Sequence, residues 1–224
     1  MNNERITVRM VYARKGAMRF LSHLDLMRTV FRGFMRANVP IQLSQGFSPH
    51  QQIAFGPPLS VGMEGECEFL DFCIQQFSDL KKMRNDIECS FHNILEIKDI
   101  HYFRRSSDLL VHEIDLIAYS VSISQSIVSQ SDIDTILARD EMIVERVKEN
   151  SRKKMNVRPH IRKAAVRSDN GRKVLDLEIV SVGGGFAKPY EALQGLFAID
   201  DREARAFRVS RVNMFATASN KKVV

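Results

Sequence analysis

Apolar and polar residues alternate along residues 5–13, RITVRMVYA, in the period of two that is typical of a half-buried β-strand. From residue 22 the period becomes helical, because Leu24, Met27, Phe31 and Phe34 recur at spacings of three and four. The first half contains further predicted strands at 41–55, 66–75 and 95–103, and a second helix at 78–93. Its element order is therefore β-α-β-β-α-β, as in the ferredoxin-like fold.

The second half repeats this element order. Strands are predicted at 109–123, 153–159, 173–182 and 204–214, and helices at 131–149 and 189–197. We therefore predict an α+β fold of two ferredoxin-like (βαββαβ) units packed in tandem. Ser106, Ser107 and Asp108 mark the boundary, which gives domains 1–105 and 106–224.

Charge is distributed unevenly along the 224 residues. Residues 1–60 carry 8 Lys/Arg against 2 Asp/Glu, and residues 151–224 carry 16 against 7, whereas residues 61–150 carry 9 against 18. Two basic ends and an acidic middle are compatible with binding of a polyanion, or with ordinary solvated charge.

Several classes of protein are disfavoured by the sequence. There is no run of 18 apolar residues and no apolar signal-peptide core, so we expect no membrane association. Three cysteines without CxxC spacing argue against disulfides and favour the cytoplasm. No cofactor is expected, and the spacing of His23, His50 and His160 does not indicate a metal site.

The stretch GAMRFLSHLDLMR, residues 16–28, combines a serine, a histidine and an aspartate before a helix. Neighbours in sequence rarely form a catalytic triad, so we interpret Ser22 and Asp25 as a helix cap. His23 could bind phosphate or act as an acid or base. Arg28, Arg32 and Arg36 follow at spacings of four and predict a basic stripe on the helix.

A polar loop follows this helix at residues 44–50, SQGFSPH. Phe47 and His50 could stack on the bases of a single strand, as exposed rings do in many nucleic-acid-binding proteins. Alternatively, the loop is a tight turn in which Phe47 closes the core.

The strongest electrostatic feature is residues 151–167, with seven basic residues and no acidic one. Phosphate contacts and a solvated basic loop are both possible interpretations. On a strand, alternate residues would share one face. The candidate phosphate contacts in this segment are Lys153, Lys154, Arg158, His160 and Arg162. Gly183–Gly185 could also cradle a phosphate, but a flexible connector is the favoured interpretation.

RFLSHLDLMR, SQGFSPH and ECEFLDF, together with VRPHI and the KPYE segment at 188–191, carry a family resemblance. With these motifs the chain resembles the radical-SAM-associated domain of unknown function. The resemblance implies a radical SAM protein as partner and supplies no activity. The doubled βαββαβ order is also similar to that of CRISPR repeat-processing endoribonucleases.

Three hypotheses follow. The first is a non-catalytic RNA-binding accessory that presents RNA, such as tRNA or rRNA, to a radical SAM partner. The second is a metal-independent endoribonuclease, with His23 or His50 as the base and Lys15 or Arg19 stabilising the transition state. The third is a protein-interaction module without nucleic-acid binding. The predicted RNA contacts in the first domain are Lys15, Arg19, His23, Arg28, Arg32, Phe47 and His50.

Overall fold

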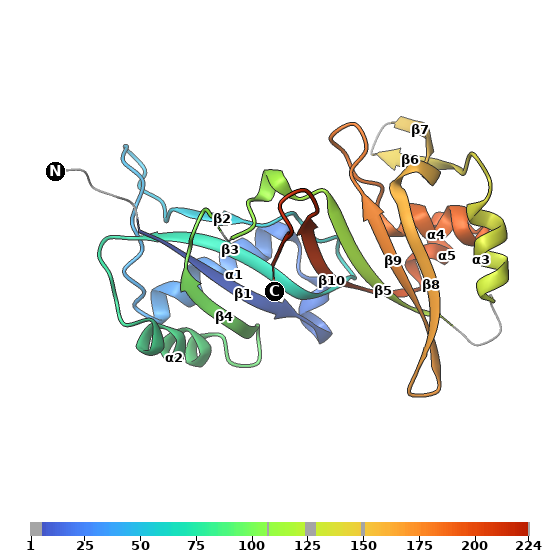
Figure 1. Cartoon of the computed structure of the whole chain (residues 1–224). Helices are drawn as coiled ribbons and strands as arrows, with labels where there is room; N and C mark the ends of the chain where they lie inside the picture. The colour runs from blue at the N-terminus through green and yellow to red at the C-terminus, as the bar shows by residue number, and fades with distance from the viewer. Residues whose placement is uncertain (1–5, 107, 124–128, 149–150, 224) are drawn as a thin grey trace. The chain divides into compact units, whose positions relative to one another are not determined.

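A computed structural model describes residues 6–106, 108–123, 129–148 and 151–223 as a mixed α/β structure. The chain divides into two compact units, which Figure 1 shows with their elements labelled. Unit 1 comprises Met1–Glu113 with Lys221–Val224, and unit 2 comprises Ile114–Asn220. Among the described residues, no helix is both long and apolar enough to cross a membrane.

Unit 1 has strands in the order β4-β1-β3-β2, and each adjacent pair is antiparallel. The predicted strands and helices of this half are confirmed, with ends that differ by a few residues, although β2 is much shorter than predicted. The elements of unit 1 are β1 (Ile6–Arg14), the 3₁₀ helix η1 (Gly16–Phe20), α1 (His23–Arg36), β2 (Ile53–Phe55), β3 (Glu64–Ile74), α2 (Leu80–Ser90), β4 (Glu96–Tyr102), the 3₁₀ helix η2 (Val111–Glu113) and β11 (Lys221–Lys222).

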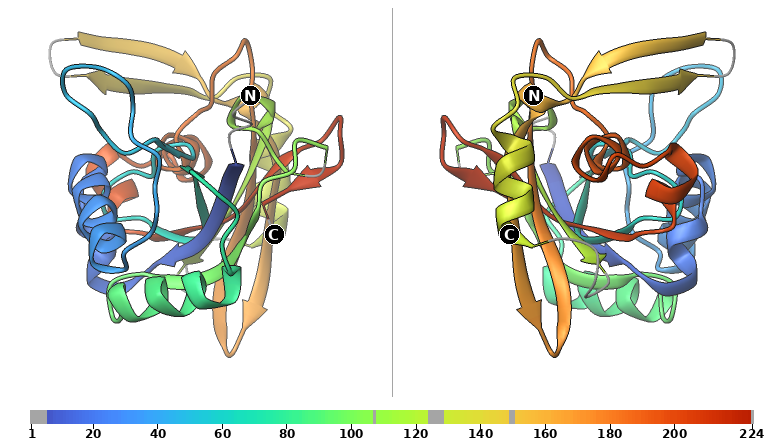
Figure 2. Two further views of the ribbon diagram at one scale, coloured as in Figure 1. Left: turned by 90° about the vertical axis from the view of Figure 1, so that its left-hand side faces the viewer. Right: turned by 90° about the vertical axis from the view of Figure 1, so that its right-hand side faces the viewer.

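The core of unit 1 lies between its sheet and the helices α1 and α2 (Figure 2). Alternate residues of β1 point to this core, because side chains on a strand alternate between its two faces. Val30 and Phe34 of α1 pack there, and Phe34 lies 4.9 Å from Phe72 and 5.9 Å from Phe91 between ring centroids. Because the apolar face of α1 packs against the core, the arginines of α1 lie on its outer side.

Gly33 is the point of closest approach between α1 and the core. A Cβ built on Gly33 would lie 2.1 Å from Cζ of Phe91, a ring with no exposed surface. Gly33→Ala is expected to lower the free energy of unfolding, because overpacking costs about 1–3 kcal/mol and exceeds the roughly 1 kcal/mol gain in helix propensity. Urea denaturation measures this change. The Gly33→Ala, Phe91→Leu double variant should recover part of the loss, and a more stable single variant would contradict the packing described.

Unit 2 has strands in the order β10-β5-β9-β8, and each adjacent pair is again antiparallel. A separate antiparallel hairpin, β6–β7, stands outside this sheet (Figures 1 and 2). The elements of unit 2 are β5 (Leu116–Ile123), α3 (Gln130–Leu137), β6 (Ile143–Lys148), β7 (Ser151–Asn156), the 3₁₀ helix η3 (Arg158–His160), β8 (Ile161–Asp169), β9 (Arg172–Val180), α4 (Pro189–Phe197), α5 (Asp201–Arg205) and β10 (Arg208–Ala216).

The prediction of a helix over 131–149 is wrong. Helix α3 ends at Leu137, and residues 143–148 form strand β6 instead. The polar run after Ala138 offers no apolar helical face, and Val144 is buried on the hairpin. The side chain of Asn156 closes the hairpin base by accepting a hydrogen bond from the backbone N–H of Met142 at 2.9 Å.

Three predicted strands of this half also need correction. The strand predicted at 153–159 is present as β7, but it ends at Asn156 and pairs with β6 in a separate two-stranded sheet. The strand β8 of the larger sheet was not predicted. The strand predicted from residue 109 begins only at Leu116. The strand predicted from residue 204 begins at Arg208, since Asp200 caps the short helix α5 just before it.

Candidate nucleic-acid interface

The basic stripe, Arg28, Arg32 and Arg36, runs along the outer side of α1. Their spacing of four places them above one another on a helix. Arg28 is well exposed and contacts Asp25 at 3.3 Å, while Arg36 donates to the carbonyl of Ser90 at 3.0 Å. Arg32 is exposed, and within the described part of the chain no ion pair is assigned to it. The stripe therefore presents cationic groups to solvent.

Residues Ser44–His50 form a loop, termed the aromatic loop below, whose two ends are tied together. The backbone N–H of Ser44 donates to the carbonyl of His50 at 2.8 Å, and the His50 N–H donates to Ser44 Oγ at 3.1 Å. Ser44 Oγ also lies 2.8 Å from His50 Nδ1. Phe47, at the tip, is fully exposed (110%). The interpretation in which Phe47 closes the core is therefore wrong.

The aromatic loop projects from the sheet near the end of α1 (Figure 1). On either side of it, Gln42 donates to the carbonyl of Cys73 at 2.7 Å, and Cys73 donates to the carbonyl of Gln52 at 3.1 Å. These bonds attach the base of the loop to the last residues of β3. Val39 donates to the carbonyl of Phe34 at 3.1 Å, which joins the same segment to the end of α1. The base of the loop is thus attached to β3 and to the C-terminal end of α1.

Two predicted contacts, Lys15 and Arg19, precede α1 and are paired with carboxylates. Lys15 Nζ lies 2.6 Å from Glu66 and 3.8 Å from Glu96, and the hydrogen bond to Glu66 raises the pKa of Lys15 above its usual value. Lys15 therefore stays protonated at neutral pH and cannot act as a base. Arg19 Nη1 lies 3.4 Å from the buried Glu64, and its guanidinium stacks on Phe20. The positive charges of Lys15 and Arg19 are therefore largely balanced by carboxylates of unit 1.

The interpretation of Ser22 as a helix cap is confirmed. Ser22 Oγ accepts a hydrogen bond from the backbone N–H of Asp25 at 3.1 Å and donates to the Asp25 carboxylate at 2.7 Å. Both side chains are thereby occupied in the first turn of α1. This geometry gives Ser22 no activating base, so the stretch starts a helix and does not form a nucleophile.

Loss of this cap has a predictable cost. Ser22→Ala is expected to lower the free energy of unfolding by about 0.5–2 kcal/mol, because the N–H of Asp25 loses its acceptor. Ser22→Asp supplies an equivalent acceptor and should retain most of the stability. Chemical denaturation of both variants measures the difference, and equal loss in the two would show that capping is not the role of Ser22.

The two candidate catalytic histidines make different contacts. The His23 ring contacts Phe55 edge-on at 5.6 Å, whereas His50 Nδ1 lies 2.8 Å from Ser44 Oγ within the aromatic loop. The two rings thus have different partners, and these contacts do not pair them as an acid and a base acting on the same bond. Within the described residues, no group of three or more metal-ligating side chains is found.

The basic segment 151–167 divides into exposed and structural residues. Lys153 and Lys154 on β7 are exposed, and Arg162 is exposed with a long 3.7 Å ion pair to Glu178. Arg158 instead donates to the carbonyls of Leu137 at 2.7 Å and Ile161 at 3.1 Å.

His160 is also part of the fold. It is buried, and its Nδ1 lies 3.1 Å from the carbonyl of Val180. The expectation that Arg158, His160 and Arg162 alternate on a strand is wrong, because 158–160 is a 3₁₀ helix.

The three-glycine loop forms a tight turn and is not a flexible connector. Val182 and Gly185 exchange two backbone hydrogen bonds, at 2.9 and 3.2 Å, around Gly183 and Gly184, which both have positive φ. Such a turn favours glycine at both central positions.

Sequence reasoning missed the buried charged residues. Arg9, 1% exposed, makes two hydrogen bonds to Asp71 at 2.7 and 2.8 Å and lies over Phe69. In unit 2, Arg146 of the hairpin makes two 2.7 Å bonds to the buried Glu191 of α4. The clue in the sequence is an arginine inside an otherwise apolar strand pattern, which requires a buried partner.

The two compact units, built of antiparallel strands with several helices, define a mixed α/β protein. A family model described as "Uncharacterized protein conserved in bacteria (DUF2344)" matches residues 7–189. The chain therefore belongs to this bacterial family, DUF2344.

Comparison with curated proteins and solved structures gives no further information on the function of this chain. No curated protein matches the chain significantly. Among solved structures, a protein of Shewanella oneidensis assigned to the dyp-type peroxidases aligns over 96% of this chain and 92% of its own, with 11% identity and a TM-score of 0.24. A likeness at that score supports no conclusion about fold or activity.

Proposed function

We propose that this protein is a non-catalytic RNA-binding accessory that presents a substrate RNA, such as tRNA or rRNA, to a radical SAM partner. The observation that carries the proposal is the exposed Phe47 on a loop with tied ends, in the same unit as the basic stripe of α1. Exposed rings stack on bases without regard to sequence, and cations of a basic surface hold the phosphates.

The fold is consistent with this role. We propose that each unit is ferredoxin-like, with β6–β7 as an insertion in unit 2. The strand orders β4-β1-β3-β2 and β10-β5-β9-β8, with antiparallel neighbours, support this. Lys153, Lys154 and Arg162 would give unit 2 a second, independent contact with the same RNA. The radical SAM partner is inferred from the family resemblance of the motifs RFLSHLDLMR and SQGFSPH.

A salt titration tests the RNA-binding part. The apparent affinity for a labelled single strand and for a tRNA should fall steeply with salt, as release of counterions requires. The Arg28→Ala, Arg32→Ala double variant should bind more weakly and flatten the log–log slope by roughly 0.7 per lost phosphate contact. Arg104→Ala, at another exposed arginine of unit 1, is the matched control. Absence of binding at low salt would favour a protein-interaction module, in which the acidic middle of the chain docks the partner.

A cleavage assay tests the non-catalytic part. Incubation of the protein with a panel of RNAs in EDTA is expected to give no new cyclic-phosphate or 3′-phosphate ends, because the His23 ring packs on Phe55 while His50 contacts Ser44, and these contacts do not pair the two histidines as acid and base. New ends that disappear with His23→Ala would replace the accessory proposal with an endoribonuclease.

A further inference from the structure

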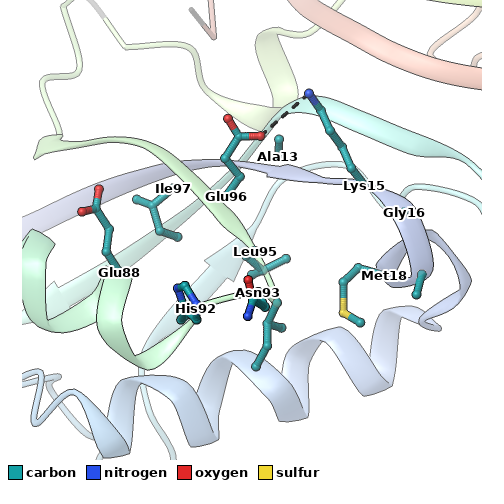
Figure 3. Close-up of a pocket in the computed structure, with 12 residues that line it drawn as sticks. Ala13, Lys15, Gly16, Met18, Glu88, His92, Asn93, Leu95, Glu96 and Ile97 are labelled. Atoms are coloured by element: carbon teal, nitrogen blue, oxygen red, sulfur yellow. Dashed lines mark ion pairs between the residues drawn. The ribbon is translucent and has the colours of Figure 1, made fainter.

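A cavity of about 580 Å³ opens in unit 1 between the end of β1 and the connection from α2 to β4 (Figure 3). Its apolar lining includes Ala13, Leu95 and Ile97, which are almost fully buried, and Met18. Its polar lining includes Lys15, Glu88, His92, Asn93 and Glu96. This volume and this mixture of apolar lining with a few polar groups are typical of sites for small organic molecules.

The ammonium group of Lys15 lies at the edge of this cavity and has N–H groups that can still donate hydrogen bonds. Glu66 takes one of its three N–H groups at 2.6 Å, while Glu96 lies 3.8 Å away, beyond hydrogen-bonding distance. Lys15 can therefore donate to an acceptor that enters between the two side chains. Figure 3 shows Lys15 and Glu96 facing each other across the rim.

The carboxylate of Glu96 offers complementary acceptors. Lys98 bonds to Oε1 of Glu96, and this bond, more than any other effect, lowers the pKa of Glu96 below its usual value. Glu96 is therefore ionised at neutral pH. Among the described residues, the ion-pair partner of its Oε2 is the distant Lys15, and a carboxylate oxygen has two lone pairs.

We propose that this cavity binds a guanine base of the RNA. Guanine presents two adjacent N–H donors and one carbonyl oxygen along one edge, so the donors can bond to Glu96 and the oxygen can accept from Lys15. Adenine presents only one donor and one acceptor to Glu96 and Lys15. An arginine side chain could donate to Glu96, but it has no acceptor for Lys15. The apolar lining would cover the flat faces of the base.

This inference rests on the proposed RNA binding and adds a base preference to it. An unstacked base of a single strand is the form in which proteins usually read RNA sequence. The cavity lies beside η1, which precedes α1 in the chain, so it belongs to the same unit as the basic stripe.

Titration of the full chain with GMP, AMP, CMP and UMP, followed by NMR or calorimetry, tests the inference. GMP is expected to bind most tightly. Glu96→Gln should weaken GMP binding by roughly 5-fold to 100-fold, the range that a lost bidentate contact to a base gives. Glu141→Gln, at an exposed carboxylate of unit 2, is the matched control.

A blocking variant separates this site from general RNA binding. Ala17→Trp adds a ring at an exposed lining position and should abolish GMP binding without altering the thermal unfolding of the chain. Equal binding of all four mononucleotides, or of none, would overturn the guanine site while RNA binding through the stripe stands. Tighter binding of L-arginine amide than of GMP would also overturn it. If GMP binds and single-stranded RNA does not, the proposed function fails and with it the assignment of an RNA base.

Discussion

Glu191→Ala is expected to lower the free energy of unfolding by about 3–5 kcal/mol, because it leaves a partly buried guanidinium without its partner. Glu191 is 4% exposed and accepts two 2.7 Å bonds from Arg146 and one of 2.7 Å from the backbone N–H of Lys188. The variant removes a salt bridge and a helix cap together. Urea denaturation gives the change directly.

A matched control lies in the same unit. Glu178→Ala breaks a 3.7 Å pair with the exposed Arg162 and should cost less than about 1 kcal/mol. A double variant with Arg146→Met and Glu191→Leu should regain much of the loss, since apolar replacement of a buried pair is often neutral. A cost for Glu191→Ala no larger than that for Glu178→Ala would mean that the salt bridge does not hold the hairpin to α4.

Phe47→Ala is expected to weaken binding of single-stranded RNA by about 5-fold to 150-fold, since stacking of one base on an aromatic ring contributes roughly 1–3 kcal/mol. The stability of the chain should not change, because Phe47 makes no contribution to the core. Phe77→Ala is the control, at a ring that is 73% exposed but packs against Tyr102 at 5.1 Å. Fluorescence anisotropy at constant salt measures both. Equal weakening by the two variants would argue against a specific role for the aromatic loop.

Much of unit 1 could be predicted from the sequence because its elements follow one another without insertions. The alternation of β1 correctly places Val8, Met10 and Tyr12 in the core. The helical spacing of Leu24, Met27, Phe31 and Phe34 identifies the helix but not its buried face, because α1 contributes Leu26, Val30 and Phe34 to the core and Leu24 is 63% exposed. Unit 2 was harder to predict because the hairpin β6–β7 interrupts the pattern. Its strand pairing depends on Asn156, Arg158 and Glu191, contacts that no local period reveals.

The candidate site was predicted in part. The exposure of Arg28 and Arg32 follows from helix periodicity. That of Lys153 and Lys154 does not, because adjacent strand residues point to opposite faces. Arg158 could not be separated from them, because its carbonyl partners are distant or lie across a turn. The same limitation applies to the pocket beside Lys15, whose walls come from segments about eighty residues apart. The local sequence therefore identified the charged residues. Only the tertiary structure shows which of them are bonded to other groups of the protein and which face solvent.

Ultraviolet cross-linking of the full chain to a uridine-containing single strand, followed by mass spectrometry of the peptides, tests the central claim most directly. The account predicts nucleotide adducts on the peptide that contains Phe47, and their loss when Arg28 and Arg32 are replaced with alanine. Adducts confined to peptides of the acidic middle, or no adducts under conditions where the RNA remains intact, would contradict it.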